Sequence, residues 1–273
     1  MSANASGGDW LGLSGRIAVV TGGASGIGRA TANSLSSVGA AVALLDINLE
    51  GAKAAAQTIA ETGGKAIAVA CDTTSEASIA AARKEVEAAL GGADILVNNA
   101  GILRPGGLDK LSLADWNKIL AVNLTGYLLA AQAFGEGMRQ RKRGALVHIA
   151  SIAATEPQPF SGAYSTAKAG VHMLSRQLAY EWGPEGVRSN VVSPGFVRTA
   201  LSESYYQVPG VLEARSKLVP IGRVATPDDL AQVITFLVSD RAGYVSGTEV
   251  LVDGGANTIL MGQVSRPGYE RGN

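Results

Sequence analysis

The sequence predicts an α/β fold, a doubly wound parallel sheet of about seven strands with helices on both faces. Short apolar runs rich in β-branched residues alternate with longer stretches of helical periodicity along most of the 273 residues. Repeated strand–helix–strand units require a parallel sheet, and right-handed crossovers would wind it in both directions from the first strand. Neither an internal repeat nor a Pro/Ser-rich linker divides the chain, so we expect a single domain over residues 1–273.

The first strands and helices follow this pattern most clearly. Residues 17–20 are a β-branched run followed by glycines, which is typical of a buried strand. A helix is predicted over 28–38, a second strand over 41–45 and a second helix over 49–62. The later strands are expected at 66–70, 95–97, 146–149, 190–192 and 250–252, and the later helices at 77–90, 113–137, 161–182 and 227–239.

Three segments depart from the alternation. An N-terminal arm is expected at 1–12 and a C-terminal tail at 256–273. Residues 201–220 have no clean apolar period. A long irregular segment in a compact domain is typical of a functional lid, so we predict a substrate lid at 201–220.

The composition argues against several classes of protein. With 47% hydrophobic residues the chain can bury a sizeable core, and its 23 basic residues balance 23 acidic ones. A net charge of zero favours neither nucleic acid nor an anionic membrane as a partner. Residues 1–8 lack the pattern of a signal peptide, and no apolar run is long enough to span a bilayer. Cys71 is the only cysteine, so we expect a buried thiol, no internal disulfide and a cytoplasmic protein.

A glycine-rich turn follows the first strand. It runs Thr21-Gly22-Gly23-Ala24-Ser25-Gly26-Ile27-Gly28 and opens a helix. Glycines let the backbone approach a pyrophosphate closely, and the helix N-terminus offers free N–H groups and the positive end of a dipole. The turn lacks the Gly-Lys-Ser/Thr ending of a nucleoside-triphosphate loop. The sequence therefore predicts a dinucleotide site of the Rossmann type.

Asp46 ends the second strand, 18 positions after Gly28. An aspartate there can accept hydrogen bonds from the adenosine ribose and would repel a 2′-phosphate. Ile47 and Asn48 follow it, and Ser25 rather than a basic residue lies in the turn. We therefore expect NAD rather than NADP. The alternative is that Asp46 only caps the next helix.

Tyr164 and Lys168 are four positions apart in a predicted helix, so their side chains share one face. A free tyrosine has a pKa of about 10, and nearby cations favour its phenolate. Bringing that pKa near 7 needs roughly 4 kcal/mol, which Lys168 and a positive nicotinamide ring could supply in a partly dry pocket. Alone, such a pair is common and usually marks a solvated helix face.

With these motifs in order, the chain resembles the single-domain short-chain dehydrogenases/reductases from Gly15 to about Gly255. The matching motifs are Thr21-Gly22-x-x-x-Gly26-x-Gly28, Asn98-Asn99-Ala100-Gly101, Asn123 in Val122-Asn123-Leu124-Thr125-Gly126, Ser151, Tyr164-x-x-x-Lys168, Pro194-Gly195 with Thr199, and Asp253-Gly254-Gly255. Each motif is modestly specific, but the whole set at this spacing is very specific.

The resemblance implies a catalytic tetrad of Asn123, Ser151, Tyr164 and Lys168. Tyr164 would be the general acid or base, and Ser151 would hold the substrate oxygen. Lys168 would bind the nicotinamide ribose and lower the pKa of Tyr164, and Asn123 would hold a water that connects Lys168 with solvent. The implied cofactor contacts are Gly22, Ser25, Gly26, Ile27, Gly28, Asp46, Ile47, Asp72, Asn99, Ala100, Gly101, Tyr164, Lys168, Pro194, Gly195, Val197 and Thr199.

Several of these residues also allow a structural interpretation. Ser151 could cap a strand end, and Asn123 could satisfy backbone groups at a helix kink. Asn98 is expected to tie neighbouring strands together. We expect His148 and His172 to be packed or interface residues, and no His, Cys or carboxylate cluster has metal-ligand spacing.

The substrate is expected to be a neutral or partly apolar secondary alcohol or ketone. The predicted substrate contacts are Ser151, Ala153, Phe160, Tyr164, Phe196 and Tyr205, with Ile152, Pro157 and Tyr206 as further walls. Arg104 and Glu156 are the only charged residues expected nearby. These residues favour hydride transfer between NAD(H) and a small alcohol or ketone.

Other functions and the assembly are also considered. A 3-oxoacyl-thioester reductase of the same family is an alternative, although Asp46 and the zero net charge weigh against it. A non-catalytic NAD-binding protein would be expected to lack Tyr164 or Lys168, and an epimerase would need a longer C-terminal domain. The family resemblance implies a homotetramer, with a dimer as second choice, and the tail 256–273 is hypothesised to reach a neighbouring subunit's site.

Overall fold

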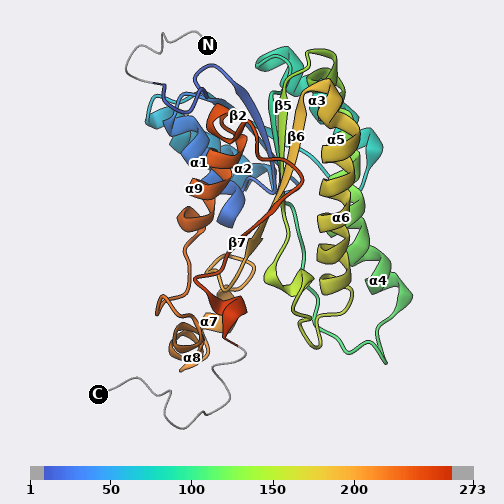
Figure 1. Cartoon of the computed structure of the whole chain (residues 1–273), viewed down its shortest axis with the longest axis vertical. Helices are drawn as coiled ribbons and strands as arrows, with labels where there is room; N and C mark the ends of the chain where they lie inside the picture. The colour runs from blue at the N-terminus through green and yellow to red at the C-terminus, as the bar shows by residue number, and fades with distance from the viewer. Residues whose placement is uncertain (1–8, 260–273) are drawn as a thin grey trace.

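The computed structural model describes residues 9–259 and contains the expected sheet (Figure 1). Among these residues, seven strands pair in parallel in the order β3-β2-β1-β4-β5-β6-β7. The strands are β1 (Ile17–Thr21), β2 (Ala41–Asp46), β3 (Ala66–Ala70), β4 (Ile95–Asn98), β5 (Gly144–Ile149), β6 (Val187–Pro194) and β7 (Glu249–Val252). Because β1 pairs with both β2 and β4, the chain winds outward from β1 in both directions, and the predicted doubly wound sheet is confirmed.

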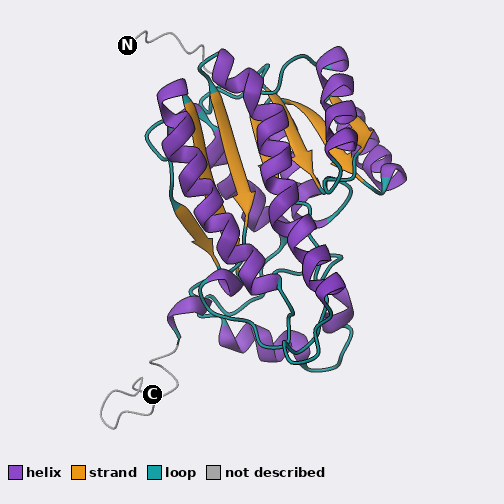
Figure 2. Ribbon diagram, turned by 90° about the vertical axis from the view of Figure 1, so that its right-hand side faces the viewer, coloured by secondary structure: helices purple, strands orange, loops and turns teal. Residues whose placement is uncertain are grey.

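Helices cover both faces of the sheet (Figures 1 and 2). The layer on one face contains α1, α2 and α9, and the layer on the other contains α3, α5 and α6. The helices are α1 (Gly26–Ser37), α2 (Leu49–Glu61), α3 (Glu76–Ala89), α4 (Leu113–Leu120), α5 (Gly126–Gln140), α6 (Tyr164–Trp182), α7 (Glu203–Tyr206), α8 (Val211–Leu218) and α9 (Pro227–Val238). Short 3₁₀ turns lie at Ile152–Ala154, Gly183–Glu185, Asp240–Ala242 and Ala256–Thr258. No helix between residues 9 and 259 is long and apolar enough to cross a membrane.

The core consists of two apolar layers, one on each face of the sheet. Val19 and Val20 of β1 are both completely buried, and they face opposite layers because side chains alternate along a strand. Val20 packs in the layer that contains Leu35 of α1, and Val19 packs in the layer that contains Phe134 of α5. A strand that is covered on both sides is typically a continuous apolar run, as residues 17–20 of β1 are.

Two predicted segments differ from the structure. The helix predicted over 113–137 is divided into α4 and α5 by a π-turn at Ala121–Thr125. In this turn the Asn123 amide donates to the carbonyl O of Ile119 at 3.1 Å, so it satisfies a backbone group that the wider turn releases. The segment 201–220, predicted to be irregular, contains α7 and α8. Neither helix buries a residue completely, which explains why the segment lacks an apolar period.

A chain of buried polar residues passes through the core at His148. The Asn98 amide lies 3.1 Å from His148 Nδ1, and His148 Nε2 lies 3.1 Å from the Ser189 hydroxyl, which lies 2.8 Å from that of Ser175. Burial, together with the charge of Lys168, lowers the pKa of His148 to about 3. His148 is therefore a neutral, packed histidine.

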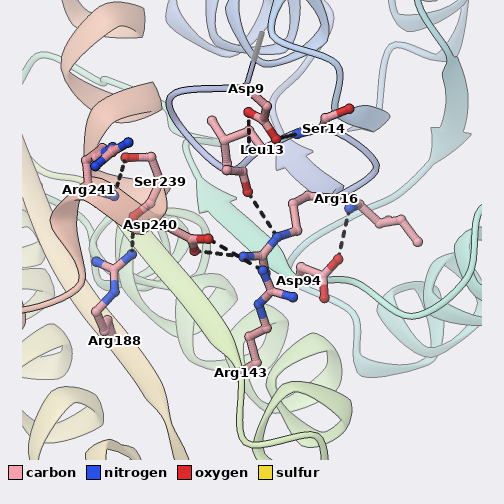
Figure 3. A network of polar contacts seen from close by, with 12 residues as sticks. Asp9, Leu13, Ser14, Arg16, Asp94, Arg143, Arg188, Ser239, Asp240 and Arg241 are labelled. Carbon is pink, nitrogen blue, oxygen red and sulfur yellow. Dashed lines mark hydrogen bonds and ion pairs between the residues drawn. The ribbon is translucent and has the colours of Figure 1, made fainter. Parts of the chain in front are cut away.

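A polar network holds the start of the described chain against the loop after α9 (Figure 3). Arg16 Nη2 donates to Asp240 Oδ1 at 2.7 Å, and the Asp240 N–H donates to Leu11 O at 3.0 Å. Asp9 accepts from the N–H of Leu13 at 3.0 Å. This part of the predicted N-terminal arm is therefore bound to the rest of the fold beside the amino end of β1.

We expect His148 to make the protein less stable below neutral pH. Its pKa is about 3 in the folded protein against an ordinary value of 6.5, so between these values only the unfolded state binds the proton. The free energy of unfolding should fall by about 2 kcal/mol from pH 7 to pH 5 through this one group. Denaturant titrations at both pH values measure the change. In His148→Gln this part of the pH dependence should disappear, and an unchanged dependence would contradict the assignment.

Candidate active site

A cavity of about 1210 Å³ lies at the carboxyl ends of the strands. Its walls include residues at or just after the ends of five strands: Gly22 after β1, Asp46 of β2, Asn99 after β4, Ser151 after β5 and Pro194 of β6. The carboxyl edge of a doubly wound sheet, where the strand order reverses, is the usual place for a ligand. The volume exceeds that of ordinary small-molecule sites, which hold about 300–1,000 Å³, so it suits a dinucleotide together with a substrate.

The glycine-rich turn brings the backbone to one end of this cavity. Gly22 and Gly26 have φ of +66° and +54°, values that L-residues with side chains rarely adopt. A Cβ on Gly22 would lie 2.8 Å from Asn99 Nδ2. Within residues 9–259 no side chain caps the N-terminus of α1, and Ser25 at its N-cap makes no such bond. The first N–H groups of α1 are therefore available to an anion.

Gly28, predicted to contact the cofactor, does not line the cavity. A Cβ there would collide with the carbonyl O of Gly22 and would lie 2.6 Å from Asn99 Nδ2. Its role is close packing between α1 and the turn, which no larger residue would permit.

Asp46 lies at the end of β2 with its carboxylate held by two backbone groups. Oδ2 accepts from the N–H of Ala24, in the glycine-rich turn, at 3.0 Å, and Oδ1 accepts from the N–H of Asn48 at 2.9 Å. Asn48, not Asp46, is the N-cap of α2, and it accepts from the Gly51 N–H at 3.1 Å. A carboxylate offers about four acceptor positions, so Asp46 keeps capacity for ribose hydroxyls.

Lys168 is 3% exposed and donates from Nζ to Ile149 O at 2.8 Å and to Tyr127 Oη at 3.1 Å. Burial lowers the pKa of its amine to about 7. The same Nζ lies 5.7 Å from the ring centroid of Tyr164. It also lies near Gly101, where a Cβ would be 3.9 Å from Nζ and 2.8 Å from Asn123 Oδ1. The structure thus brings three members of the predicted tetrad to one point.

Asn123 is completely buried, and its amide group is bound to backbone atoms. Oδ1 accepts from the Ile102 N–H at 3.1 Å, and Nδ2 donates to Ile102 O at 2.9 Å and to Ile119 O. The structural role expected for Asn123 is therefore present. Its carbonyl oxygen keeps one free lone pair, which could accept a hydrogen bond from a water beside Lys168.

Ser151 and Tyr164 line the same cavity. The Ser151 hydroxyl accepts from the Ala153 N–H at 3.1 Å, so it caps the short turn after β5. Burial raises the pKa of Tyr164, and a hydrogen bond with Ser151 opposes this shift only in part. The sequence predicted a lowered pKa for Tyr164. The groups of the chain alone leave this pKa above its ordinary value.

The remaining predicted positions divide clearly. All predicted cofactor residues other than Gly28 line the cavity, and so do the predicted substrate residues Ser151, Ala153, Tyr164, Phe196 and Tyr205. Phe160 does not. It is 77% exposed in a left-handed turn (φ +56°), where its backbone pairs with Gly106, so we leave it out of the substrate contacts. The tail beyond Ile259 and the first eight residues lie outside the described residues.

The sequence-based prediction missed several residues in or behind the cavity wall, two of which matter for the chemistry. Tyr127 holds Lys168, and Arg215 of α8 lines the cavity beside Phe196. Tyr127 follows the Asn123 motif by one helical turn, which was the available signal, whereas the position of Arg215 depends on how 201–220 folds. Among the described residues, no group of three or more His, Cys, Asp or Glu side chains could hold a metal ion.

Comparisons with known proteins agree with this geometry. The profile of a family described as enoyl-(acyl carrier protein) reductase matches residues 22–257. D-threitol dehydrogenase of Mycolicibacterium smegmatis is 43% identical over 89% of this chain and 93% of its own length. Cis-4-hydroxycyclohexanecarboxylate dehydrogenase of Sinomonas cyclohexanicum is 40% identical over 89% of this chain and 97% of its own length.

A solved structure has the same fold. The crystal structure of a gluconate 5-dehydrogenase from Burkholderia cenocepacia, in complex with NADP and tartrate, matches with a TM-score of 0.87 and 34% identity, over 92% of this chain and 98% of the other. The sequence motifs, the sheet order and these matches agree: the chain belongs to the short-chain dehydrogenase/reductase family of oxidoreductases.

Proposed function

We propose that the protein oxidises a secondary alcohol to a ketone with NAD, and that Tyr164 takes the hydroxyl proton. The observation that carries this proposal is one shared cavity. Its walls include Tyr164, Ser151 and Lys168 as well as the glycine-rich turn and Asp46.

The residues at the turn fit a dinucleotide. The uncapped N-terminus of α1 suits the pyrophosphate, and Asp46, whose carboxylate keeps free acceptor positions, suits the ribose hydroxyls of NAD. A bound nicotinamide ring would supply the hydride acceptor. Since a 2′-phosphate would meet the Asp46 carboxylate, NAD is the proposed cofactor, although the Burkholderia relative was crystallised with NADP.

The side chains of the chain itself handle the proton. Ser151 orients the substrate oxygen beside the Tyr164 hydroxyl. Tyr164 accepts the proton as the carbonyl forms and returns it in the reverse reaction. Lys168, held by Ile149 O and Tyr127 Oη, presents an ammonium group near Tyr164 and so favours the phenolate. Asn123 keeps the backbone around Lys168 in place.

The names of the relatives suggest which alcohols to try. They refer to a polyol, a hydroxylated ring acid and a sugar acid. We propose 201–220, with α7 and α8, as the lid that selects among such compounds. A 3-oxoacyl-thioester reductase is the alternative, and an acetoacetyl thioester belongs in the same panel because the matched family profile is named for an acyl-carrier-protein reductase.

We also propose a homotetramer in the cytoplasm, with a dimer as second choice. Several large side chains at the surface support self-association, among them Tyr244 (103% exposed) after α9 and Leu251 (43%) on β7.

Tyr164→Phe should abolish turnover without abolishing cofactor binding. In a panel of threitol, cis-4-hydroxycyclohexanecarboxylate, gluconate and simple cyclic alcohols, the wild type should reduce NAD with at least one member. The variant should lose a factor of about 10³ or more in kcat, because general acid–base catalysis contributes about 10²–10⁴ and no other group can take the proton.

NADH fluorescence should still report binding of the cofactor to the variant. Tyr180→Phe, on the exposed side of the same helix, is the control. Near-full activity of Tyr164→Phe would end the proposed mechanism.

Asp46→Ser should reverse the choice of cofactor. We expect kcat/KM with NADP to rise relative to that with NAD by about tenfold or more, since one repulsive charge near a phosphate costs roughly 1–2 kcal/mol in a partly exposed site. Steady-state kinetics with both cofactors measure the ratio. Asp72→Asn, a charge change elsewhere in the cavity, should leave the ratio unaltered. A wild type that prefers NADP would refute the role given to Asp46.

Tyr127→Phe should impair Lys168 without touching the substrate. Removing the hydroxyl that accepts from Nζ costs a hydrogen bond to a charged group, about 1.5–3 kcal/mol, so kcat should fall about tenfold or more with little change in KM. The ammonium form also loses an acceptor, so the pKa of Lys168 should fall further. Less of the ammonium then remains at high pH, and the loss of kcat should be greater at pH 9 than at pH 7. A uniform loss at all pH values would mean that Tyr127 acts only in packing.

A further inference from the structure

Arg215 of α8 lies among three aromatic rings at the edge of the cavity. Its Cζ is 5.3 Å from the ring centroid of Phe196, 5.4 Å from that of Tyr205 and 5.1 Å from that of Tyr206. All four residues line the same cavity as Tyr164. Aromatic rings attract a guanidinium group, so these three rings hold Arg215 at this position.

The hydrogen-bonding capacity of this guanidinium is unused. Within residues 9–259, the Arg215 side chain forms no hydrogen bond or ion pair. The arginines that precede and follow it in the chain are paired. Arg198 forms a bidentate pair with Glu203, and Arg223 forms one with Asp229. Aromatic rings interact with the π surface of a guanidinium, whereas its five N–H donors lie in the plane and remain available.

Two other cations of the cavity, Arg104 and Lys168, are already bound to partners within the described chain. Arg104 Nη1 lies 3.3 Å from Asp115, and Lys168 donates to Ile149 O. Lys118 also lines the cavity and forms no ion pair within residues 9–259, but it lies on the side of Asp72, whose pKa is lowered mainly by hydrogen bonds from Thr74 and further by the charge of Lys118. Glu156 also lines the cavity but is exposed, and no ion pair joins it to Arg215 in the described chain.

A second donor lies beside Arg215. The Tyr206 hydroxyl is buried and has no hydrogen-bond partner among the described residues, although its ring contacts the guanidinium. A buried hydroxyl without a partner is unfavourable, and an acceptor atom from a ligand would satisfy it. A planar guanidinium, with the hydroxyl of a tyrosine whose ring contacts it, is a fitting site for a carboxylate.

We propose that Arg215 binds a carboxylate of the substrate, so that the enzyme selects secondary alcohols carrying a carboxylate over neutral ones. This inference rests on the proposed function for its kinetic consequence. It adds Arg215 to Arg104 and Glu156, the charged residues that the sequence predicted near the substrate. The three rings form the apolar wall for the body of the substrate, and Arg215 sets the end at which the carboxylate lies.

Two measurements test the proposal. In the first, kcat/KM with NAD is compared for cis-4-hydroxycyclohexanecarboxylate and its carboxamide. The wild type should prefer the acid, and Arg215→Met should lower kcat/KM for the acid by about 10- to 100-fold, mainly through KM, while the carboxamide changes less than about threefold. Lys217→Met removes a charge from an exposed position of the same helix and should preserve the preference. An equal loss for both substrates would overturn the proposal, because Arg215 would then only organise α7 and α8.

The second measurement does not depend on turnover. Calorimetry compares the binding of cyclohexanecarboxylate and cyclohexanecarboxamide, neither of which has an alcohol to oxidise. The wild type should bind the acid about tenfold more tightly or better, and Arg215→Met should bind both alike. Absence of turnover with every alcohol would refute the proposed function, while this titration would still decide the role of Arg215. Equal binding of the two compounds to the wild type would refute the carboxylate site.

Discussion

Parallel pairing at β1 is the constraint on which the site depends. Parallel strands are joined by crossovers that return the chain to the same edge, so each strand delivers its following residues at one end of the sheet. Because β1 pairs with both β2 and β4, the chain leaves β1 in opposite directions. The Asn99 amide joins the loop after β4 to the end of β1, because it donates to Thr21 O at 3.0 Å and to Gly22 O at 3.1 Å. The absence of a side chain at Gly28 is what allows that approach.

A buried amine is the least favourable feature of this arrangement in energetic terms. Within residues 9–259, Lys168 has two oxygen acceptors, Ile149 O and Tyr127 Oη, in place of the water that burial removes, and burial lowers its pKa to about 7. Helix α6 carries both Lys168 and Tyr164, so the rigid spacing of one helical turn keeps the amine close to the phenol. The same burial that weakens the ammonium raises the pKa of Tyr164. One dry environment therefore disfavours both charged forms, the Lys168 ammonium and the Tyr164 phenolate.

Local backbone requirements explain what could be predicted from the sequence. The roles of Gly22 and Gly26 could be predicted because their positive φ values favour glycine. The role of Asp46 could be predicted because it ends a strand. Gly28 and Phe160 do not line the cavity, because a position in the chain does not say which side of a turn faces it. Tyr127 contacts a residue 41 positions away and Arg215 contacts rings from two other segments, and neither contact has a periodic signature. The division between α4 and α5 likewise depends on one amide, that of Asn123, binding backbone atoms.

The shallow attachment of α7 and α8 has a consequence for how such a protein diversifies. Neither helix contains a completely buried residue, so the free energy of folding depends little on which side chains they carry. Mutations there can accumulate with little effect on the core, while those at Tyr205, Tyr206 or Arg215 alter the wall of the cavity. Mutations near Lys168 or the glycine-rich turn have no such freedom, because their surroundings are closely packed. One scaffold can thus keep its redox chemistry and change the alcohols it accepts through drift in a single, loosely held segment.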